Sequence, residues 1–259
     1  SFYRDLINEY LRECQDQPPK DMTWSECLDK SRGYLELTQQ HFSQAVSELQ
    51  GVAIGAGVGF PDLFASCIEE YYSPFLDKKG CTDIILLPPK NDRTLVLHTN
   101  DLSPSISKYI VSVEWNIDDL PTQYAVGVCG YSISAGLNDT GLVLSGNELV
   151  PNDVRVGVPR SIIAREIICA KNLDEAVVMA NNPYRASSYN NIITIKGRSV
   201  SIEGSATASQ TLEPNEGILC HSNHYLGSQM TSYEGEPNYK SSINRFSSAI
   251  SLTRDLKYP

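Results

Sequence analysis

The sequence predicts an α+β fold in which helices cover β-sheets. In residues 2–49, apolar side chains such as Phe2, Leu6 and Tyr10 recur at helical spacing. From residue 82 to 149, runs rich in Val, Ile, Leu and Tyr predict a series of strands. Further helices and a hairpin follow, and this order favours sheets with helices on the outside.

The N-terminal part, residues 1 to about 78, is predicted to be helical, with an interruption at the glycine-rich stretch 51–59. That stretch contains Gly55-x-Gly57-x-Gly59, which is similar to part of a nucleotide-binding loop. A helix rather than a strand precedes it, and the third glycine of the fingerprint is absent at the required spacing. We therefore interpret it as a turn before a short helix starting at Pro61.

Alternation and turn residues predict five strands after the helical part, at 82–87, 94–100, 109–115, 124–131 and 142–149. A turn at residues 138–141 is predicted to join the last two. The rest of the chain predicts helices at 159–170 and 173–181, a hairpin of 189–195 and 198–202 turning at Lys196-Gly197, a short run at 218–221 and a final helix near 242–255.

Composition excludes several functions. The chain has 259 residues, 41% of them hydrophobic, so it can bury one sizeable core. Its net charge of -10, with no basic cluster, disfavours nucleic acid and acidic membranes as partners. No apolar run approaches the ~20 residues of a membrane span, and the start lacks the order of a signal peptide. We expect a cytoplasmic protein.

The cysteines and histidines predict neither a metal site nor a cofactor. Seven cysteines are widely spread without a CxxC pair, as expected of buried small side chains in a reducing compartment. His98, His221 and His224 could be imagined as a metal triad, but no helix is predicted to bring the last two onto one face. We expect packed or hydrogen-bonded histidines.

The dipeptide Gly80-Cys81 stands where the helical segment gives way to the first strand. The proline-containing stretch 88–93 cannot continue a sheet, so a hairpin turning about Asn91 is the simplest prediction. The corresponding register places Cys81 opposite Asp101, with their Cβ atoms ~5 Å apart. A shift of one residue would send one of these side chains to the other face.

Six stretches occur in a fixed order: Glu48–Leu63, Gly80–Thr82, His98–Asp101, Asn138–Leu144 with Gly157–Arg160, Ser201–Ser205, and His221–His224, followed by Asn244-Arg245. Together they resemble the penicillin acyltransferase family of N-terminal-nucleophile hydrolases. The resemblance implies a four-layer αββα sandwich of mainly antiparallel sheets. Family members usually begin with strands before the position of Phe2 and continue beyond that of Pro259, so we expect a fragment or an unusually short member.

The resemblance also implies self-cleavage between Gly80 and Cys81. A helical segment of residues 1–80 would then stay with residues 81–259 as an α/β heterodimer. The new α-amine of Cys81, with a reference pKa of about 7.7–8.0, would accept the thiol proton. A small-molecule amide would acylate Cys81, and water or an amine would resolve the thioester, with no metal or cofactor required.

Three further residues receive roles from the resemblance. Asn223 is the candidate oxyanion donor, and Asp101 would orient the thiol and the amine by hydrogen bonding, since a carboxylate raises the pKa of a neighbouring ammonium. Ser205 is a candidate for a supporting hydrogen bond. Each can also be interpreted as a turn cap or structural residue.

Two alternative functions stay open at this point. One is a non-catalytic or unprocessed binding protein with the same fold. The other is an amidase of the bile-salt or N-acylethanolamine type, whose cysteine generally lies near the start of the chain.

Overall fold

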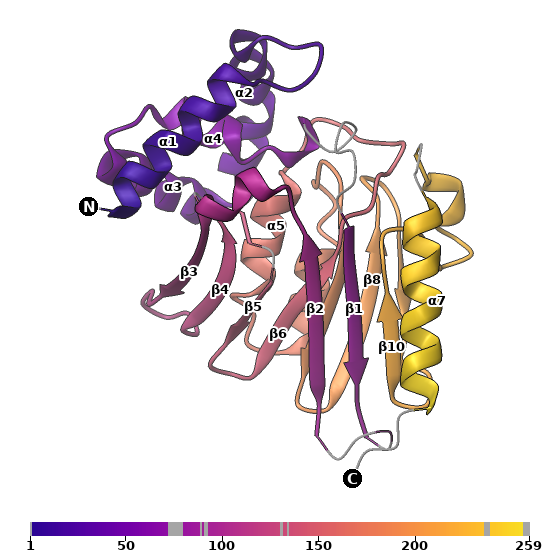
Figure 1. Cartoon of the computed structure of the whole chain (residues 1–259). Helices are drawn as coiled ribbons and strands as arrows, with labels where there is room; N and C mark the ends of the chain where they lie inside the picture. The colour runs from indigo at the N-terminus through magenta and orange to yellow at the C-terminus, as the bar shows by residue number, and fades with distance from the viewer. Residues whose placement is uncertain are drawn as a thin grey trace.

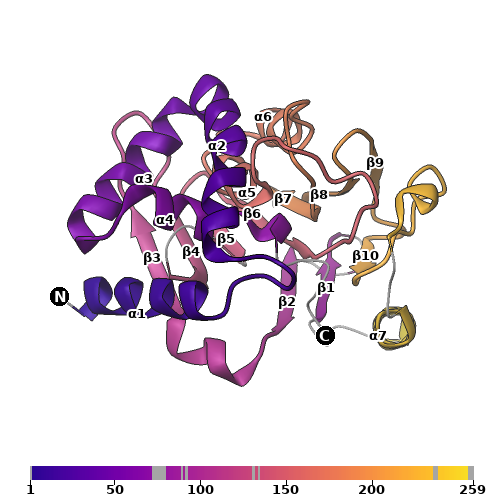
Figure 2. The same ribbon diagram turned by 90° about the horizontal axis from the view of Figure 1, so that it is seen from above.

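The computed structural model describes residues 2–71, 80–88, 90, 93–129, 132–133, 135–235 and 239–255. Two antiparallel sheets pack face to face, and helices cover their outer faces (Figure 1). Helices α5 and α6 lie on the seven-stranded sheet, whereas α7 lies on the three-stranded sheet, at the opposite side in Figure 2. This arrangement confirms the predicted α+β fold and its four layers.

Four helices and a short 3-10 turn precede the first strand: α1 (Phe2–Asp16), α2 (Trp24–His41), α3 (Ser43–Ala56), α4 (Phe60–Ser66) and η1 (Glu69–Tyr71). They gather over one end of the seven-stranded sheet, near β3 and β4 (Figure 1). The helical prediction is confirmed to residue 71, and residues 72–78 lie outside the described residues.

One boundary within the helical part differs from the prediction. The helices break at Phe42, and α3 runs through Gly51 to end before Gly57, which has φ 71°. A short helix then begins at Phe60, so the turn predicted for 51–59 is limited to residues 57–59 and the prediction is wrong for 51–56. Gly51 does not stop the helix because glycine weakens a helix interior without removing a backbone hydrogen bond.

The small sheet has the order β10 (Ile218–His221), β1 (Gly80–Leu86) and β2 (Leu95–Asp101). The large sheet runs in chain order through β3 (Ile110–Trp115), β4 (Gln123–Val128), β5 (Ala135–Asn138), β6 (Leu142–Asn147), β7 (Asn190–Ile195), β8 (Arg198–Gly204) and β9 (Ser209–Leu212). The sequence did not predict β5 and β9, because four residues show little alternation. Consequently the turn at 138–141 joins β5, not the strand predicted at 124–131, to β6.

The other elements are η3 (Pro104–Tyr109), α5 (Arg160–Ile167), α6 (Leu173–Ala180), η4 (Thr231–Tyr233) and α7 (Tyr239–Asp255). Helices α5, α6 and α7 confirm the three predicted C-terminal helices. The turn between β7 and β8 has positive φ at Lys196 (48°) and Gly197 (78°), which suits a tight hairpin. Among the described residues, no helix combines the length and the apolar composition that a membrane span requires.

The register of the β1–β2 hairpin corrects a prediction. Cys81 faces Asn100, whereas Asp101 faces Gly80, so the predicted pairing of Cys81 with Asp101 is wrong by one residue. Because side chains alternate along a strand, the side chains of Cys81 and Asp101 point to opposite faces of the small sheet.

The difference is already present at the other end of the hairpin, where Leu86 rather than Leu87 faces Leu95, so the connection is one residue longer than predicted. On its other edge β1 continues its ladder with the β10 side, where the N–H of Leu87 donates to the carbonyl of Gly217 at 2.7 Å. The side chain of Leu87 packs between the two sheets with Ile85 and Leu219. Pairing with β2 ends at Leu86, and the predicted turn about Asn91 lies outside the described residues.

Asn138 ties the β5–β6 turn to the end of α5. Its buried amide donates to the carbonyls of Ile168 (2.9 Å) and Ala170 (2.8 Å) and accepts the N–H of Leu142 (3.2 Å). Asn138→Ala leaves these groups without their partner, so we expect the free energy of unfolding to fall by about 3 kcal/mol. Urea denaturation measures this, with the exposed neighbour variant Asp139→Ala as control. A change within about 0.5 kcal/mol, as for a surface site, would contradict the prediction.

Candidate active site

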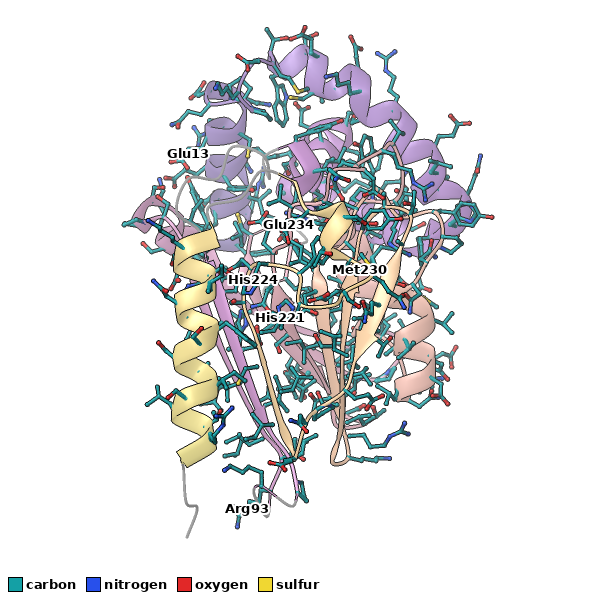
Figure 3. The ribbon with its side chains drawn as sticks, turned by 90° about the vertical axis from the view of Figure 1, so that its right-hand side faces the viewer. Glu13, Arg93, His221, His224, Met230 and Glu234 are labelled. Atoms are coloured by element: carbon teal, nitrogen blue, oxygen red, sulfur yellow. The ribbon has the colours of Figure 1, made fainter. Side chains whose placement is uncertain are left out.

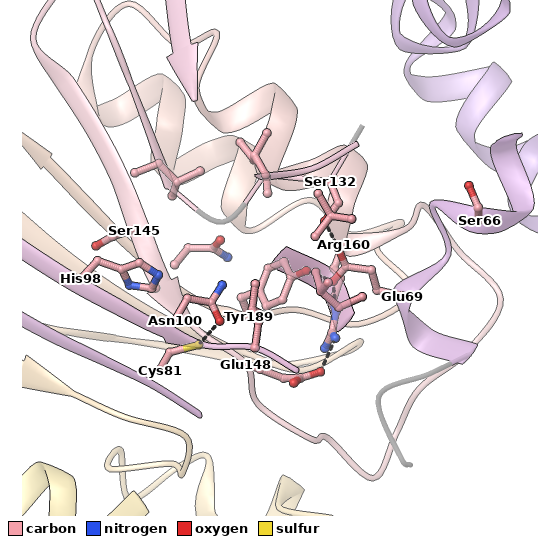
Figure 4. Close-up of a pocket in the computed structure, with 18 of the residues that line it drawn as sticks. Ser66, Glu69, Cys81, His98, Asn100, Ser132, Ser145, Glu148, Arg160 and Tyr189 are labelled. Atoms are coloured by element: carbon pink, nitrogen blue, oxygen red, sulfur yellow. Dashed lines mark hydrogen bonds and ion pairs between the residues drawn. The ribbon is translucent and has the colours of Figure 1, made fainter. Parts of the chain in front are cut away.

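Cys81, the second residue of β1, lines a cavity of about 320 Å³ at the ends of the two sheets (Figure 4). Its side chain is 9% exposed and faces the space between the sheets. On one side of it lie His98 and Ser145, and on the other lie Glu148 and a charged group around Arg160. The thiol thus stands midway along a cavity large enough for a small molecule.

Two side chains hold the main chain of Cys81. The N–H of Cys81 donates to Oδ1 of Asn223 at 2.8 Å. Arg245 of α7 donates to the carbonyl of Cys81, to Oγ1 of Thr82 at 2.9 Å and to Oδ1 of Asn223 at 2.8 Å. The peptide nitrogen of the Gly80–Cys81 bond is therefore fixed by a side-chain acceptor.

The orientation of the Asn223 amide follows from its partners. Its Oδ1 accepts hydrogen bonds from Cys81 and Arg245, while its Nδ2 donates to the carbonyl of Glu148 at 3.0 Å. Its own N–H donates to Oγ of Ser242 on α7 at 2.7 Å. The amide NH₂ carries a second N–H, and a hydrogen bond from the Asn223 side chain lowers the pKa of the Cys81 thiol; the role of Asn223 as an oxyanion donor stays a prediction.

The ends of two side chains occupy the space beside Gly80. A Cβ there would lie 2.8 Å from Nη2 of Arg245 and 3.0 Å from Oδ2 of Asp101. Glycine lets these two side chains approach the peptide before Cys81, and a larger residue would have to displace them. Asp101 therefore lies on the Gly80 side of the strand, away from the thiol.

The sulfur of Cys81 has polar neighbours despite its burial. Sγ donates to Oδ1 of Asn100 at 3.6 Å. Burial raises the pKa of the Cys81 thiol to about 11; a hydrogen bond from the Glu148 peptide lowers it, and the charges of Glu148 and Asp83 raise it further. Before cleavage the thiol is therefore protonated at neutral pH.

This pKa makes a testable prediction for molecules that still contain the Gly80–Cys81 bond. Alkylation of Cys81 by iodoacetamide should be slow at pH 7.5 and rise about tenfold per pH unit until the pH nears 11, since only the thiolate reacts. The tryptic peptide of residues 80–90, which contains the uncut bond, reports this by mass spectrometry. A rate already constant from pH 8 upward would show that the thiolate is stabilised instead.

Ser205 lies apart from the other predicted residues. It is fully buried at the end of β8, donates to Oδ2 of Asp153 at 2.9 Å and accepts the N–H of Ala208 at 3.0 Å. It is not among the residues that line the cavity with Cys81. These contacts are those of a turn residue, and we assign Ser205 no part in the chemistry below.

Sequence reasoning did not assign roles to Asn100, Glu148 and Arg245. Asn100 stands beside Asp101 in a matched stretch, and the wrong register hid its contact with Cys81. Arg245 belongs to the matched pair Asn244-Arg245, a signal that could have indicated a role. Glu148 contributes main-chain atoms, which leave no trace in the sequence.

A buried charged group forms the far side of the cavity. Arg160 is 2% exposed and lies 2.6 Å from Oε1 of Glu148 and 3.5 Å from Oε2 of Glu69. Tyr189 donates to Glu69, and its ring lies beneath the guanidinium. The guanidinium is thereby balanced by carboxylates, which lowers its attraction for an anionic substrate.

The three histidines are hydrogen-bonded, as predicted. Asp83 binds His98, Glu203 binds His221, and Ser242 lies 2.7 Å from Nδ1 of His224. Figure 3 shows His221 and His224 beside α7. No cluster of three or more metal-ligating side chains was found within the described parts of the chain.

Comparison with known proteins relates the chain to amide-bond enzymes. Residues 88–259 match the family model of acyl-coenzyme A:6-aminopenicillanic acid acyl-transferase, a match that begins after Cys81. A β-alanyl-dopamine/carcinine hydrolase of Drosophila melanogaster is 33% identical over 193 residues, which is 66% of this chain and 47% of that protein. The chain thus spans about half the length of this relative.

Two solved structures overlap more distantly. A variant of conjugated bile acid hydrolase from Clostridium perfringens is 11% identical, with a TM-score of 0.33 and 71% of this chain and 52% of that chain covered. Penicillin V acylase from Agrobacterium tumefaciens is 15% identical, with a TM-score of 0.30 and 70% and 54% covered.

Proposed function

Because this chain belongs to the acyl-coenzyme A:6-aminopenicillanic acid acyl-transferase family, we propose that it is a self-processing amide hydrolase with Cys81 as its nucleophile. The main support is the position of Cys81: its thiol lies in the cavity wall, its N–H donates to Asn223 and its carbonyl accepts a hydrogen bond from Arg245. The insect relative is a β-alanyl-dopamine/carcinine hydrolase, so β-alanyl amides are the proposed substrate class.

The first step is cleavage of the chain. Sγ of Cys81 attacks the carbonyl carbon of Gly80 and its proton passes to the leaving nitrogen of Cys81, so that the amide becomes a thioester. Water then hydrolyses the thioester, which leaves a carboxylate on Gly80 and a free α-amine on Cys81. The contact of Asn223 with the Cys81 nitrogen supports this step, since it orients the group that must leave.

The second step is turnover of a substrate amide. The α-amine, with a reference pKa of about 7.7–8.0, accepts the thiol proton at neutral pH. The thiolate attacks the substrate carbonyl, the amine product leaves with a proton, and water hydrolyses the acyl-thioester. Asn223 and the Glu148 peptide N–H are the proposed donors to the oxyanion, and Asp101, on the Gly80 side, orients the α-amine.

The segment of residues 1–80 is proposed to remain bound after cleavage as one half of a heterodimer. Buried side chains of α3 and α4, such as Leu49 and Phe64, share one apolar cluster with Ile162 and Ile167 of α5. Loss of the segment would expose this cluster to water, which opposes dissociation.

Mass spectrometry of the expressed chain tests the proposal, together with hydrolysis of β-alanyl-dopamine. We expect two co-purifying fragments that meet between Gly80 and Cys81, and release of β-alanine from the substrate. An intact chain that releases β-alanine would disprove self-processing. An intact chain without hydrolysis, whose Cys81 does not react with iodoacetamide, would favour a binding protein of the same fold.

A further inference from the structure

A buried polar network runs between the two sheets and ends at the cavity. Nδ1 of His98 lies 3.1 Å from each carboxylate oxygen of Asp83, which is fully buried. Asn147 donates to Asp83 at 2.8 Å, and its Oδ1 lies 2.9 Å from Nδ1 of His221. Nε2 of His221 lies 2.7 Å from a carboxylate oxygen of the fully buried Glu203. Two carboxylates are thus joined through imidazole and amide groups, without a lysine or arginine in the chain of bonds.

The cavity end of this network has unused hydrogen-bonding atoms. Among the described residues, neither Nε2 of His98 nor Oγ of Ser145 has a hydrogen-bond partner, although both atoms are buried. Ser145 is 4% exposed, and both residues line the cavity that contains Cys81. Figure 4 shows the two side chains together at the end of the cavity beyond Asn100. Buried polar atoms without partners are rare in folded proteins, so their placement in a cavity wall indicates a ligand-binding site.

The chemistry of these atoms favours a cationic donor. In the neutral tautomer that donates Nδ1–H to Asp83, the lone pair of His98 Nε2 is the atom left without a partner, and the carboxylate behind the ring makes that nitrogen a stronger acceptor. The Ser145 hydroxyl oxygen can accept a second hydrogen bond. A protonated amino group supplies several N–H donors, and its charge offsets the buried carboxylate of Asp83.

The distance from Cys81 fits a β-amino group. His98 faces Asp83, two residues along from the pair of Cys81 and Asn100, so Cys81 and His98 are diagonal neighbours whose Cα atoms lie about 7–8 Å apart. In an acyl group attached to Cys81, three bonds of about 1.5 Å separate the carbonyl carbon from a β-amino nitrogen. That chain and one hydrogen bond of about 3 Å together have a reach similar to this separation of the two strand positions, whose side chains share one face of the sheet. The nitrogen of an α-amino group lies one bond closer to the carbonyl carbon. A propionyl group has no N–H donor at all.

We infer that His98 and Ser145 form the acyl subsite of this cavity and that they bind the protonated amino group of a β-aminoacyl substrate. The inference rests on the proposed function, because it takes Cys81 as the point of attachment. According to this inference, the acyl group of the substrate is selected at the His98 end of the cavity, which is the end opposite Arg160 and Glu69.

A matched pair of substrates tests the subsite. β-Alanyl-dopamine and N-propionyl-dopamine differ only in the amino group, and we expect wild-type kcat/KM to favour the first by about ten- to hundredfold. His98→Asn keeps a donor near Asp83 but removes the atom at the position of Nε2. It should lose most of this preference, which is measured as the ratio of kcat/KM for the two substrates within the variant and so does not depend on the variant's overall rate. Ser145→Ala should lose part of it. Thr99→Ala, on the outer face of β2, serves as the control and should keep the preference.

Two kinetic outcomes would overturn the inference: equal wild-type kcat/KM for the two substrates, or a preference retained in His98→Asn. If the preference is kept in His98→Asn but lost in Glu69→Gln, the amino group binds at the other end of the cavity. Calorimetric binding of both amides to the uncut Cys81→Ala chain separates this inference from the proposed function. Tighter binding of the β-alanyl amide there supports the subsite even if the wild type hydrolyses neither substrate, and equal binding overturns it.

Discussion

Replacing Cys81 with alanine is expected to leave the chain in one piece and to lower amide hydrolysis by at least about 10⁴-fold, as for loss of a covalent nucleophile. The substitution removes only the sulfur. Asn223 and Arg245 contact main-chain atoms of residue 81, so these contacts persist in the variant. A loss of this size therefore reports on the chemistry rather than on the fold. Mass spectrometry of the whole chain and the β-alanyl-dopamine assay measure the two effects.

Two matched variants sharpen this test. Cys81→Ser keeps the shape of the side chain but replaces the thiol by a weaker nucleophile, so it should cut slowly and accumulate uncut chain. Cys220→Ala removes another buried cysteine, on the neighbouring strand β10, and should be cut like the wild type. Cleavage or full activity in Cys81→Ala would assign the nucleophile to a different residue.

The periodicity of the sequence predicted most of the fold, because apolar spacing reports directly which face of an element is buried. The helices, the long strands and the turn at Lys196-Gly197 follow from such local signals. Local signals are weak in four-residue strands, so β5 and β9 were not predicted. They are also weak at Phe42, where two helices meet without a glycine or proline.

The register of β1 and β2 shows a second limit. A hairpin loop with one residue more or fewer is locally acceptable, so the sequence of the loop does not choose between the two registers. The register that the structure adopts turns Val96, His98 and Asn100 toward the other sheet, and it places Asn100 rather than Asp101 beside the thiol. The matched stretches located Cys81 and Asn223, but they carried no information on the cavity. His98 and Ser145 meet there only because the two sheets pack face to face.

Replacing Asn223 with alanine is the second large expected effect, because it removes the acceptor of the Cys81 N–H and the donor to the Glu148 carbonyl. We expect self-cleavage and amide hydrolysis to slow by about 10²–10³-fold, as for loss of one oxyanion donor. The rate at which uncut chain disappears measures the first effect, and kcat for β-alanyl-dopamine measures the second. Asn215→Ala, at an exposed position before β10, is the control and should behave as wild type.

Asn223→Asp separates the two roles of this side chain. Aspartate retains oxygen acceptors for Cys81 and Arg245 but has no N–H to offer an oxyanion. If Asn223 acts only by holding the Cys81 nitrogen and Arg245, the aspartate variant should recover most of the rate lost in the alanine variant. If its Nδ2 turns from the Glu148 carbonyl to the oxyanion during turnover, aspartate should be as slow as alanine, since a carboxylate would repel the developing charge. We expect the second result for hydrolysis. Wild-type rates in both variants would show that Asn223 takes no part in either reaction.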